Sequence, residues 1–180
     1  MRLEVPQRGP REFYDELMYI ASNRGKYASH PGKKVRLQSK TLTGYSVLTA
    51  LVILVFLFEY HVDRGGIFLL LSGMMLVCLI YFIALIVGIR KRINLMMSEP
   101  GTKFIDIDEK GVRFESSNQN LKTRWDEILY VIINKHSIVF MPKADTQLMI
   151  SIYSEYREQV LQAIEDAGHM DLVIDNTSKN

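Results

Sequence analysis

Two long apolar stretches in the middle of the chain constrain its fold more than any other feature. The first runs from Leu42 to Tyr60 and the second from Gly66 to Ile89, and neither contains a charged residue before Glu59. The hydrocarbon core of a bilayer, about 30 Å thick, is crossed by about 20 apolar residues in an α-helix. The sequence therefore predicts two membrane-spanning helices joined by a short polar turn. Such a hairpin leaves both chain ends on the same side of the membrane.

Two other interpretations of the first stretch fit the sequence less well. A cleaved signal peptide would lie near Met1 and end in small residues, whereas this stretch begins at residue 42 and a second one follows at once. A buried helical hairpin of a soluble protein is not expected to be this long and this free of charge. We therefore expect both stretches to lie in lipid.

Charge is distributed unevenly along the chain. Residues 1–40 carry nine Lys or Arg against four Asp or Glu, whereas residues 90–180 have a net charge of −2. Basic residues flank the apolar stretches on both sides: Lys33, Lys34, Arg36, Lys40, Arg90, Lys91 and Arg92. Short cytoplasmic flanks of membrane helices are enriched in Lys and Arg, which predicts that both termini are cytoplasmic. The same residues are candidates for contact with anionic lipid headgroups, at about 1 kcal/mol each.

The chain divides into five expected segments: an N-terminal region (1–40), the membrane hairpin (41–89), a linker (90–102), a cytoplasmic domain (103–168) and a flexible tail (169–180). The N-terminal region begins with an alternating stretch that predicts a short strand. A helix follows, with Phe13, Leu17 and Ile20 on one apolar face. After this helix the region is basic and polar, and we expect it to lie at the level of the lipid headgroups, with Tyr27 at the interface.

The cytoplasmic domain has the pattern of an antiparallel sheet. Short apolar or alternating stretches predict six strands: 104–107, 112–114, 121–125, 128–133, 137–141 and 147–152. Gly111 supplies the positive φ that the first turn needs. A helix is expected from Ser154, with Val160 and Ile164 on its apolar face, and Gly168 ends it. The predicted fold class is a membrane α-helical hairpin plus a small α+β domain, an antiparallel sheet or barrel closed by a C-terminal helix.

Four features of residues 103–168 occur together. They are the opening hairpin Ile105-Asp106-Ile107…Gly111-Val112, the single Trp125 followed by Ile128 and Val131, the strand ending Phe140-Met141-Pro142-Lys143, and the closing helix from Ser154. With two adjacent spans before them, these features resemble the YcxB-like family of bacterial membrane proteins. The resemblance implies a cytoplasmic barrel of the pleckstrin-homology (PH) type, and it implies an architecture rather than an enzymatic activity.

Few residues in the sequence indicate a chemical activity. His136 has no acid and nucleophile grouped with it in the pattern, so we interpret it as a turn residue. Asp106 and Asp108 resemble the start of a calcium loop, but Lys110 and Ser117 stand where further ligands would be required. We therefore expect neither a catalytic centre nor a metal site nor a bound cofactor.

The remaining candidates also have simple interpretations. Asp126 and Glu127 are interpreted as exposed turn charges rather than a metal-binding pair. Asn176 begins a glycosylation motif that a cytoplasmic tail would keep from the transferase. Cys78, the single cysteine, excludes an intramolecular disulfide. Trp125, the single Trp, is predicted to anchor the core of the cytoplasmic domain, and the alternative is an exposed contact for a partner.

These observations predict a multi-pass protein of the bacterial cytoplasmic (inner) membrane that presents a YcxB/PH-like domain for protein–protein interaction, without catalysis. Its expected partners are membrane lipids and a protein, either a different one or a second copy of the chain. Nucleic acid is not expected, because the cytoplasmic domain is slightly acidic. Anchoring raises the local concentration of the domain, so that a low-affinity contact suffices. The alternative is an immunity protein that neutralises a membrane-active bacterial toxin.

Overall fold

The computed structural model describes residues 1–6, 8–63, 66–98, 101–116 and 119–177. The chain forms two compact units. The sheet unit comprises Met1–Val35 and Met96–Asn180, and the hairpin unit comprises Arg36–Leu95.

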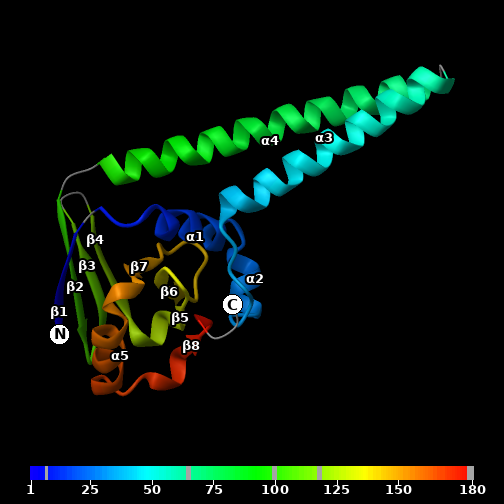
Figure 1. Ribbon diagram of the computed structural model, residues 1–180. Helices are drawn as coiled ribbons and strands as arrows, with labels where there is room; N and C mark the ends of the chain where they lie inside the picture. The colour runs from blue at the N-terminus through cyan, green and yellow to red at the C-terminus, as the bar shows by residue number, and fades with distance from the viewer. Residues whose placement is uncertain (7, 64–65, 99–100, 117–118, 178–180) are drawn as a thin grey trace. The chain divides into compact units, whose positions relative to one another are not determined.

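The hairpin unit consists of two long helices that run antiparallel, α3 (Gln38–Asp63) and α4 (Gly66–Ser98) (Figure 1). Within them, Gln38–Phe58 and Leu70–Leu95 are long and apolar enough to span a membrane. This confirms the two long apolar helices that the sequence predicts. The helix α4 is longer than expected: residues 90–98 contain no Gly or Pro, so the helix continues through most of the region that we expected to be a linker.

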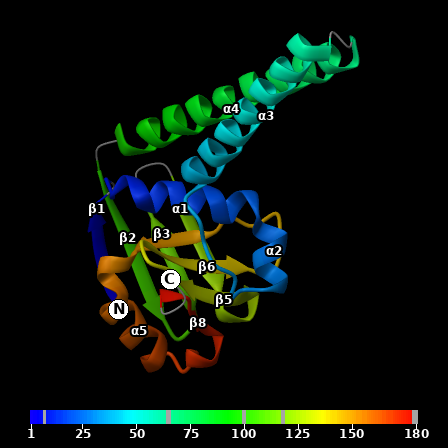
Figure 2. The same ribbon diagram turned by 45° about the vertical axis from the view of Figure 1, so that its right-hand side comes forward.

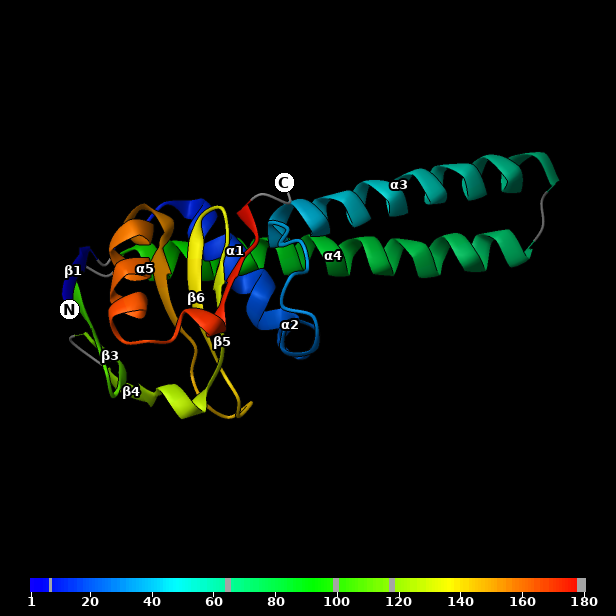
Figure 3. The same ribbon diagram turned by 90° about the horizontal axis from the view of Figure 1, so that it is seen from below.

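One stripe of side chains is shielded along each of these helices. On α3 the buried or half-buried positions include Ser46, Thr49, Ile53 and Phe56, and on α4 they include Ser72, Met75, Leu79, Phe82 and Ile86. Both series advance by alternating steps of three and four residues, the spacing by which two helices form a continuous seam. The rings of Tyr45 and Phe82 stack across the two helices with their centroids 5.8 Å apart. Figure 3 shows the helices lying side by side along their length.

The sheet unit contains two four-stranded sheets. The first sheet has the order β1-β2-β3-β4 and is antiparallel throughout. Its strands are β1 (Arg2–Pro6), β2 (Thr102–Asp108), β3 (Gly111–Glu115) and β4 (Asn120–Arg124). Gly111 opens β3 at a φ of 148°, and a Cβ there would lie 2.2 Å from the carbonyl oxygen of Thr123, so this turn requires glycine.

The second sheet has the order β7-β6-β5-β8. Its strands are β5 (Ile128–Ile133), β6 (Ser137–Pro142), β7 (Ile150–Tyr153) and β8 (Val173–Asp175). The pairs β5–β6 and β6–β7 are antiparallel, whereas β8 runs parallel to β5. All six residues of β6 are buried, which places this strand at the centre of the unit.

Three helices accompany the sheets: α1 (Arg11–Ser22), α2 (Arg24–Ser29) and α5 (Arg157–Asp166). The helices α1 and α2 cover one face of the second sheet (Figure 2). Ile20 and Tyr27 from these helices form a buried cluster with side chains of β5 and β6, among them Ile132 and Val139. The helix α5 packs against β2 of the first sheet. One part of the core therefore lies between the second sheet and the helices α1 and α2, and another lies between α5 and the first sheet.

The structure confirms a small sheet domain with antiparallel strands, and all six predicted strands are present. It does not show a closed barrel: among the residues described, the strands form two separate sheets. The last of the six begins at Ile150, three residues later than expected. The closing helix is preceded by a 3-10 turn, Ser154–Tyr156, and Ser154 makes no side-chain cap.

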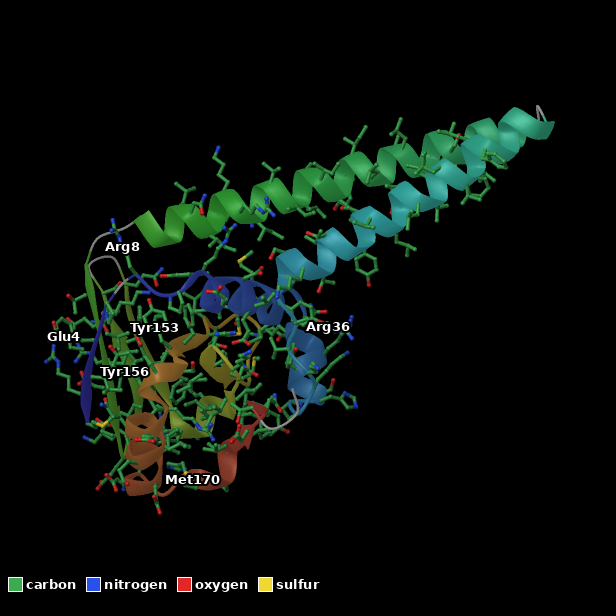
Figure 4. All side chains as sticks on the ribbon, in the orientation of Figure 1. Glu4, Arg8, Arg36, Tyr153, Tyr156 and Met170 are labelled. Carbon is green, nitrogen blue, oxygen red and sulfur yellow. The ribbon has the colours of Figure 1, made fainter. Side chains whose placement is uncertain are left out.

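The N-terminal region as far as Val35 is part of the sheet unit rather than a separate segment. Leu3 pairs with Ile105 in the register of β1 and β2, because the alternation of β1 supplies one apolar face that β2 can cover. Tyr27, expected at the membrane interface, has no exposed surface, and its hydroxyl donates to the carbonyl of Lys34 at 3.1 Å. Tyr153 of β7 lies beneath α1, where its ring meets that of Phe13 (Figure 4).

The prediction of a flexible tail from residue 169 is wrong for residues 169–177, which contain a 3-10 turn and a strand. A 3-10 turn at Met170–Leu172 leads into β8, which pairs with β5. The backbone N–H of Asn176 donates to the carbonyl of Ile133 at 2.8 Å. Three residues are too few to show strand periodicity in a sequence, and the pairing depends on a free edge of β5 that only the tertiary structure provides. Residues 178–180 lie outside the described residues.

Candidate functional site at Trp125

The candidate site begins where the chain passes from the first sheet to the second. The strand β4 ends at Arg124, a 3-10 turn covers Trp125–Glu127, and β5 begins at the next residue. The carboxylate of Glu127 accepts a hydrogen bond from the backbone N–H of Arg124 at 3.1 Å and closes this turn. The turn therefore holds Trp125 at the corner between the sheets.

The side chain of Trp125 is buried, with 6% of its surface exposed. Its indole Nε1–H donates to the carbonyl oxygen of Asp108 in the β2–β3 turn at 2.8 Å. The indole stacks on the imidazole of His169, with ring centroids 4.6 Å apart, and meets the ring of Phe140 in β6 at 6.5 Å. Trp125 therefore joins both sheets and the segment that follows α5.

A cleft of about 730 Å³ opens beside this indole. It is lined by Glu109, Lys110, Lys122, Arg124, Trp125, Asp126, Glu127 and His169. Arg124 forms an ion pair with Asp126 at 3.2 Å. Lys110 and Lys122 are exposed, and the structure shows no ion pair or hydrogen bond to either ammonium group within the residues it describes. The cleft thus combines an aromatic floor with three acidic and three basic side chains.

The seven basic flanking residues are all exposed, and they belong to both units. Lys33 and Lys34 lie in the sheet unit. Arg36 precedes α3 in the hairpin unit, Lys40 is the third residue of α3, and Arg90, Lys91 and Arg92 lie near the end of α4. Because the two helices are antiparallel, the four cations within them gather at one end of the hairpin unit. The structure also extends the helix past them, so that three consecutive cations project over a wide arc around α4.

The acidic candidates have structural roles in the fold. The carboxylate of Asp108 accepts the backbone N–H groups of Lys110 at 2.8 Å and of Gly111 at 3.1 Å, so it stabilises the β2–β3 turn. Asp106 lies near Arg2, 4.0 Å away, on the outer face of the first sheet. No group of three or more His, Cys, Asp or Glu suited to a metal ion occurs in the described part of the chain. Ser117, one of the positions weighed for calcium, lies outside the described residues.

His136 lies in the β5–β6 turn, where its backbone contacts Glu16, a buried residue that is not among the predicted candidates. Its backbone N–H donates to the carboxylate of Glu16 in α1 at 3.2 Å, and the hydroxyl of Ser137 donates to the same oxygen at 2.5 Å. Glu16 is 4% exposed, and burial raises the pKa of its carboxyl group above the ordinary 4.5. A signal was present in the sequence: Glu16 follows Phe13 by three residues and therefore lies on the apolar face of α1.

Hydrogen bonds between buried polar side chains extend from the contact between Glu16 and Ser137 to Asn176. Asn176 donates through its side-chain amide to the carbonyl of Pro31 at 2.9 Å and to the side-chain oxygen of Asn134 at 3.4 Å. The amide of Asn134 in turn donates to the hydroxyl of Ser137 at 3.3 Å. Asn176 is therefore buried in the core of the sheet unit, where it connects the C-terminal strand to the β5–β6 turn, and it is not an exposed glycosylation acceptor.

Arg24 at the start of α2 holds the loop between β6 and β7, residues 143–149. Its guanidinium group donates to the carbonyls of Ala144, Asp145 and Gln147. The planar fork of arginine suits several fixed acceptors at once. The same loop exposes 58% of Leu148. No local pattern indicates this contact, because about 120 residues separate Arg24 from the loop.

Comparison of the chain with protein-family models, with curated proteins and with solved structures found no match.

Proposed function

We propose that the protein is an integral membrane protein whose sheet unit binds another protein at the membrane surface. One observation carries the membrane part of the proposal: α3 and α4 leave most of their large apolar side chains exposed. In the most apolar 18-residue segment of α3 only 17% is buried within the molecule, and in that of α4 only 6% is buried. Large side chains such as Leu54, Phe58 and Val77 are more than 60% exposed. Exposing this apolar surface to water would cost free energy, whereas contact with lipid tails carries no such cost.

The hydroxyl groups of α3 fit a lipid environment as well. Ser46 donates to the carbonyl of Leu42 at 3.0 Å, and Thr49 donates to the carbonyl of Tyr45 at 2.9 Å. Each hydroxyl is thus satisfied within its own helix and requires no water or partner. These bonds support the proposal because they remove the cost of placing these groups in hydrocarbon.

The proposed location is the bacterial inner membrane, with both termini in the cytoplasm. The clusters that support this orientation are Lys33, Lys34, Arg36 and Lys40 before α3 and Arg90, Lys91 and Arg92 near the end of α4. The sheet unit is then cytoplasmic and connected to the hairpin at two points. Residues 36 and 37 separate Val35 from α3, and residues 99–101 separate α4 from β2. These short connections keep the sheet unit near the lipid surface and raise its local concentration there.

The proposed role of the sheet unit is binding without catalysis. The cleft beside Trp125 supports this role, because it offers an aromatic floor and the ammonium groups of Lys110 and Lys122, and within the described residues no nucleophile and base lie in contact there. The consecutive strands β1–β4 and β5–β7 pair antiparallel, and α5 follows β7. This arrangement is compatible with a PH-like domain of the YcxB-like kind, which remains part of the proposal.

Two measurements test the proposed function. Alkaline extraction of bacterial membranes should leave the full chain in the pellet, and reporter fusions at Met1 and Asn180 should both report a cytoplasmic location. Recovery of the chain in the soluble fraction would overturn the membrane assignment, and an outside C-terminus would overturn the orientation.

Photo-crosslinking in native membranes tests the binding role. A crosslinker placed at Lys122 should capture a cytoplasmic protein or a second copy of the chain, whereas one at the exposed hairpin position Val77 should capture only lipid. Capture of a membrane-active toxin through the hairpin would favour the immunity alternative instead.

A further inference from the structure

The strand β4 has a free edge. It is the last strand of the first sheet and pairs only with β3. Apart from its pairing with β3, no backbone–backbone hydrogen bond joins Asn120–Arg124 to another segment that the structure describes, and the N–H of Arg124 donates to the carboxylate of Glu127. About half of the N–H and C=O groups of an edge strand point away from its partner and are available to another chain. The strand therefore offers a place where an extended segment can add to the sheet.

The charges on this strand favour an acidic segment. Lys122 stands directly opposite Arg113 in the register of β3 and β4, an unfavourable arrangement of two cations. Arg113 has an anion nearby, since its guanidinium lies 3.9 Å from the carboxylate of Glu115. Lys122 has no such anion among the described residues. A carboxylate on an added strand would therefore stabilise its ammonium group.

The alternation of β4 extends this match to a second position. Lys122 and Arg124 lie two residues apart and therefore project from the same face of the sheet. The ion pair between Arg124 and Asp126 is exposed, with 67% and 64% of the two side chains accessible, and contributes little that an incoming carboxylate must replace. Lys110 adds a further cation at the β2–β3 turn. The edge thus presents cations at alternate positions and leads into the cleft beside Trp125, which Glu109, Asp126 and Glu127 also line.

We propose that β4 receives an extended acidic segment of a partner protein, which pairs with the free edge and places carboxylates opposite Lys122 and Arg124. The proposal rests on the proposed function of the sheet unit as a protein-binding domain, and it specifies the surface and the chemistry of the partner. Main-chain hydrogen bonds supply part of the affinity, and the alternate carboxylates supply the selectivity.

The single Trp of the chain provides the measurement, because Trp125 lies in the same cleft. The probe is a short capped peptide that alternates Glu and Val, titrated at low ionic strength into the full-length protein in detergent micelles while Trp emission is recorded. The peptide should shift the emission of Trp125 in a saturable way. A peptide with Gln in place of Glu should bind at least about tenfold more weakly, because it lacks the charges that match the edge.

Matched variants separate the edge from general electrostatics. Lys122→Glu should weaken binding of the acidic peptide about tenfold, whereas Lys122→Arg should retain it. Lys135→Glu makes the same charge change on an exposed turn of the same unit and should leave binding unchanged. Equal loss with Lys122→Glu and Lys135→Glu would show that only net charge matters, and it would overturn the proposal.

A second probe tests the main-chain pairing. The same Glu/Val peptide, N-methylated at every second residue, keeps its charges but loses the N–H groups that face β4, and it should fail to bind. Equal binding of the methylated peptide, or no binding of the parent peptide up to millimolar concentration, would overturn the edge-strand proposal. Partner crosslinks elsewhere on the sheet unit would in that case leave the proposed function standing, whereas absence of all protein crosslinks would remove both.

Discussion

Replacing Trp125 with alanine is expected to destabilise the sheet unit by about 4 kcal/mol. The side chain is 6% exposed and contacts Phe140 from the second sheet and His169 after α5, so its removal leaves a cavity that several elements would have to close. Substitutions of this kind cost about 3–5 kcal/mol. The lost hydrogen bond to Asp108 adds roughly 0.5 kcal/mol, at the low end of the usual range because water reaches this exposed turn.

The variant Trp125→Phe separates the two contributions. A phenyl ring retains most of the contact with His169 and Phe140 but cannot donate to the carbonyl of Asp108. We therefore expect a loss of about 1–2 kcal/mol, well below that of the alanine variant. The order of stability should be wild type, then the phenylalanine variant, then the alanine variant.

Hydrogen exchange measured by mass spectrometry is the suitable assay, because the helices of the hairpin unit would dominate a circular-dichroism signal. Amides of the central strand β6 exchange through unfolding of the whole unit, so their rate follows the free energy of unfolding. A loss of 4 kcal/mol corresponds to nearly a thousandfold faster exchange. Exchange in β6 that changes less than about threefold would refute the role of Trp125 as a core anchor. If partner capture were lost at the same time, the indole would be an exposed contact instead.

Three further substitutions test other contacts of the sheet unit. Burial raises the pKa of Glu16 above 4.5, so wild-type stability should decline as the pH rises from 4.5 through the folded-state pKa, and thermal melts of Glu16→Gln should lack this decline. Gly9→Ala should cost about 1–3 kcal/mol in thermal unfolding, because its Cβ would lie 2.1 Å from the buried ring of Tyr153. Gly25→Ala, in α2 with no atom within 4 Å of the new Cβ, is the control and should be neutral or slightly stabilising. Arg24→Ala should cost about 2 kcal/mol and expose the β6–β7 loop to protease, and unchanged cleavage of that loop would show that Arg24 does not hold it.

Elements that depend on nearby residues were predictable. The two apolar stretches imply long helices because every backbone group of a helix is satisfied within the helix, whatever surrounds it. The β2–β3 hairpin is encoded by Asp108 and Gly111, which lie within the turn itself. The amphipathic helix α1 follows from the spacing of its own apolar residues. In each case the information lies within one or two turns of the chain, so the pattern is visible without knowledge of the fold.

The candidate site was predictable only in part. Trp125 stands out as the single Trp, and its placement in the core agrees with its size. The partners that define the cleft come from three separate segments, and the stacking of His169 on the indole depends on how the chain after α5 returns to the first sheet. Lys122 appears in the sequence as one lysine in a polar strand. Its significance arises from the edge position of β4, which is a property of the assembled sheet.

The sequence by itself determined the composition of the hairpin, the order of the predicted strands and the apolar faces of the helices, because these features follow from local periodicity and length. Tertiary structure alone decided that β1 joins β2 across about a hundred residues, that β8 returns to β5, and that Glu16 is buried against the β5–β6 turn. These contacts join residues whose separation in the chain carries no periodic signal. Their free energy arises from burial and hydrogen bonding that exist only once the two sheets and their helices have packed together.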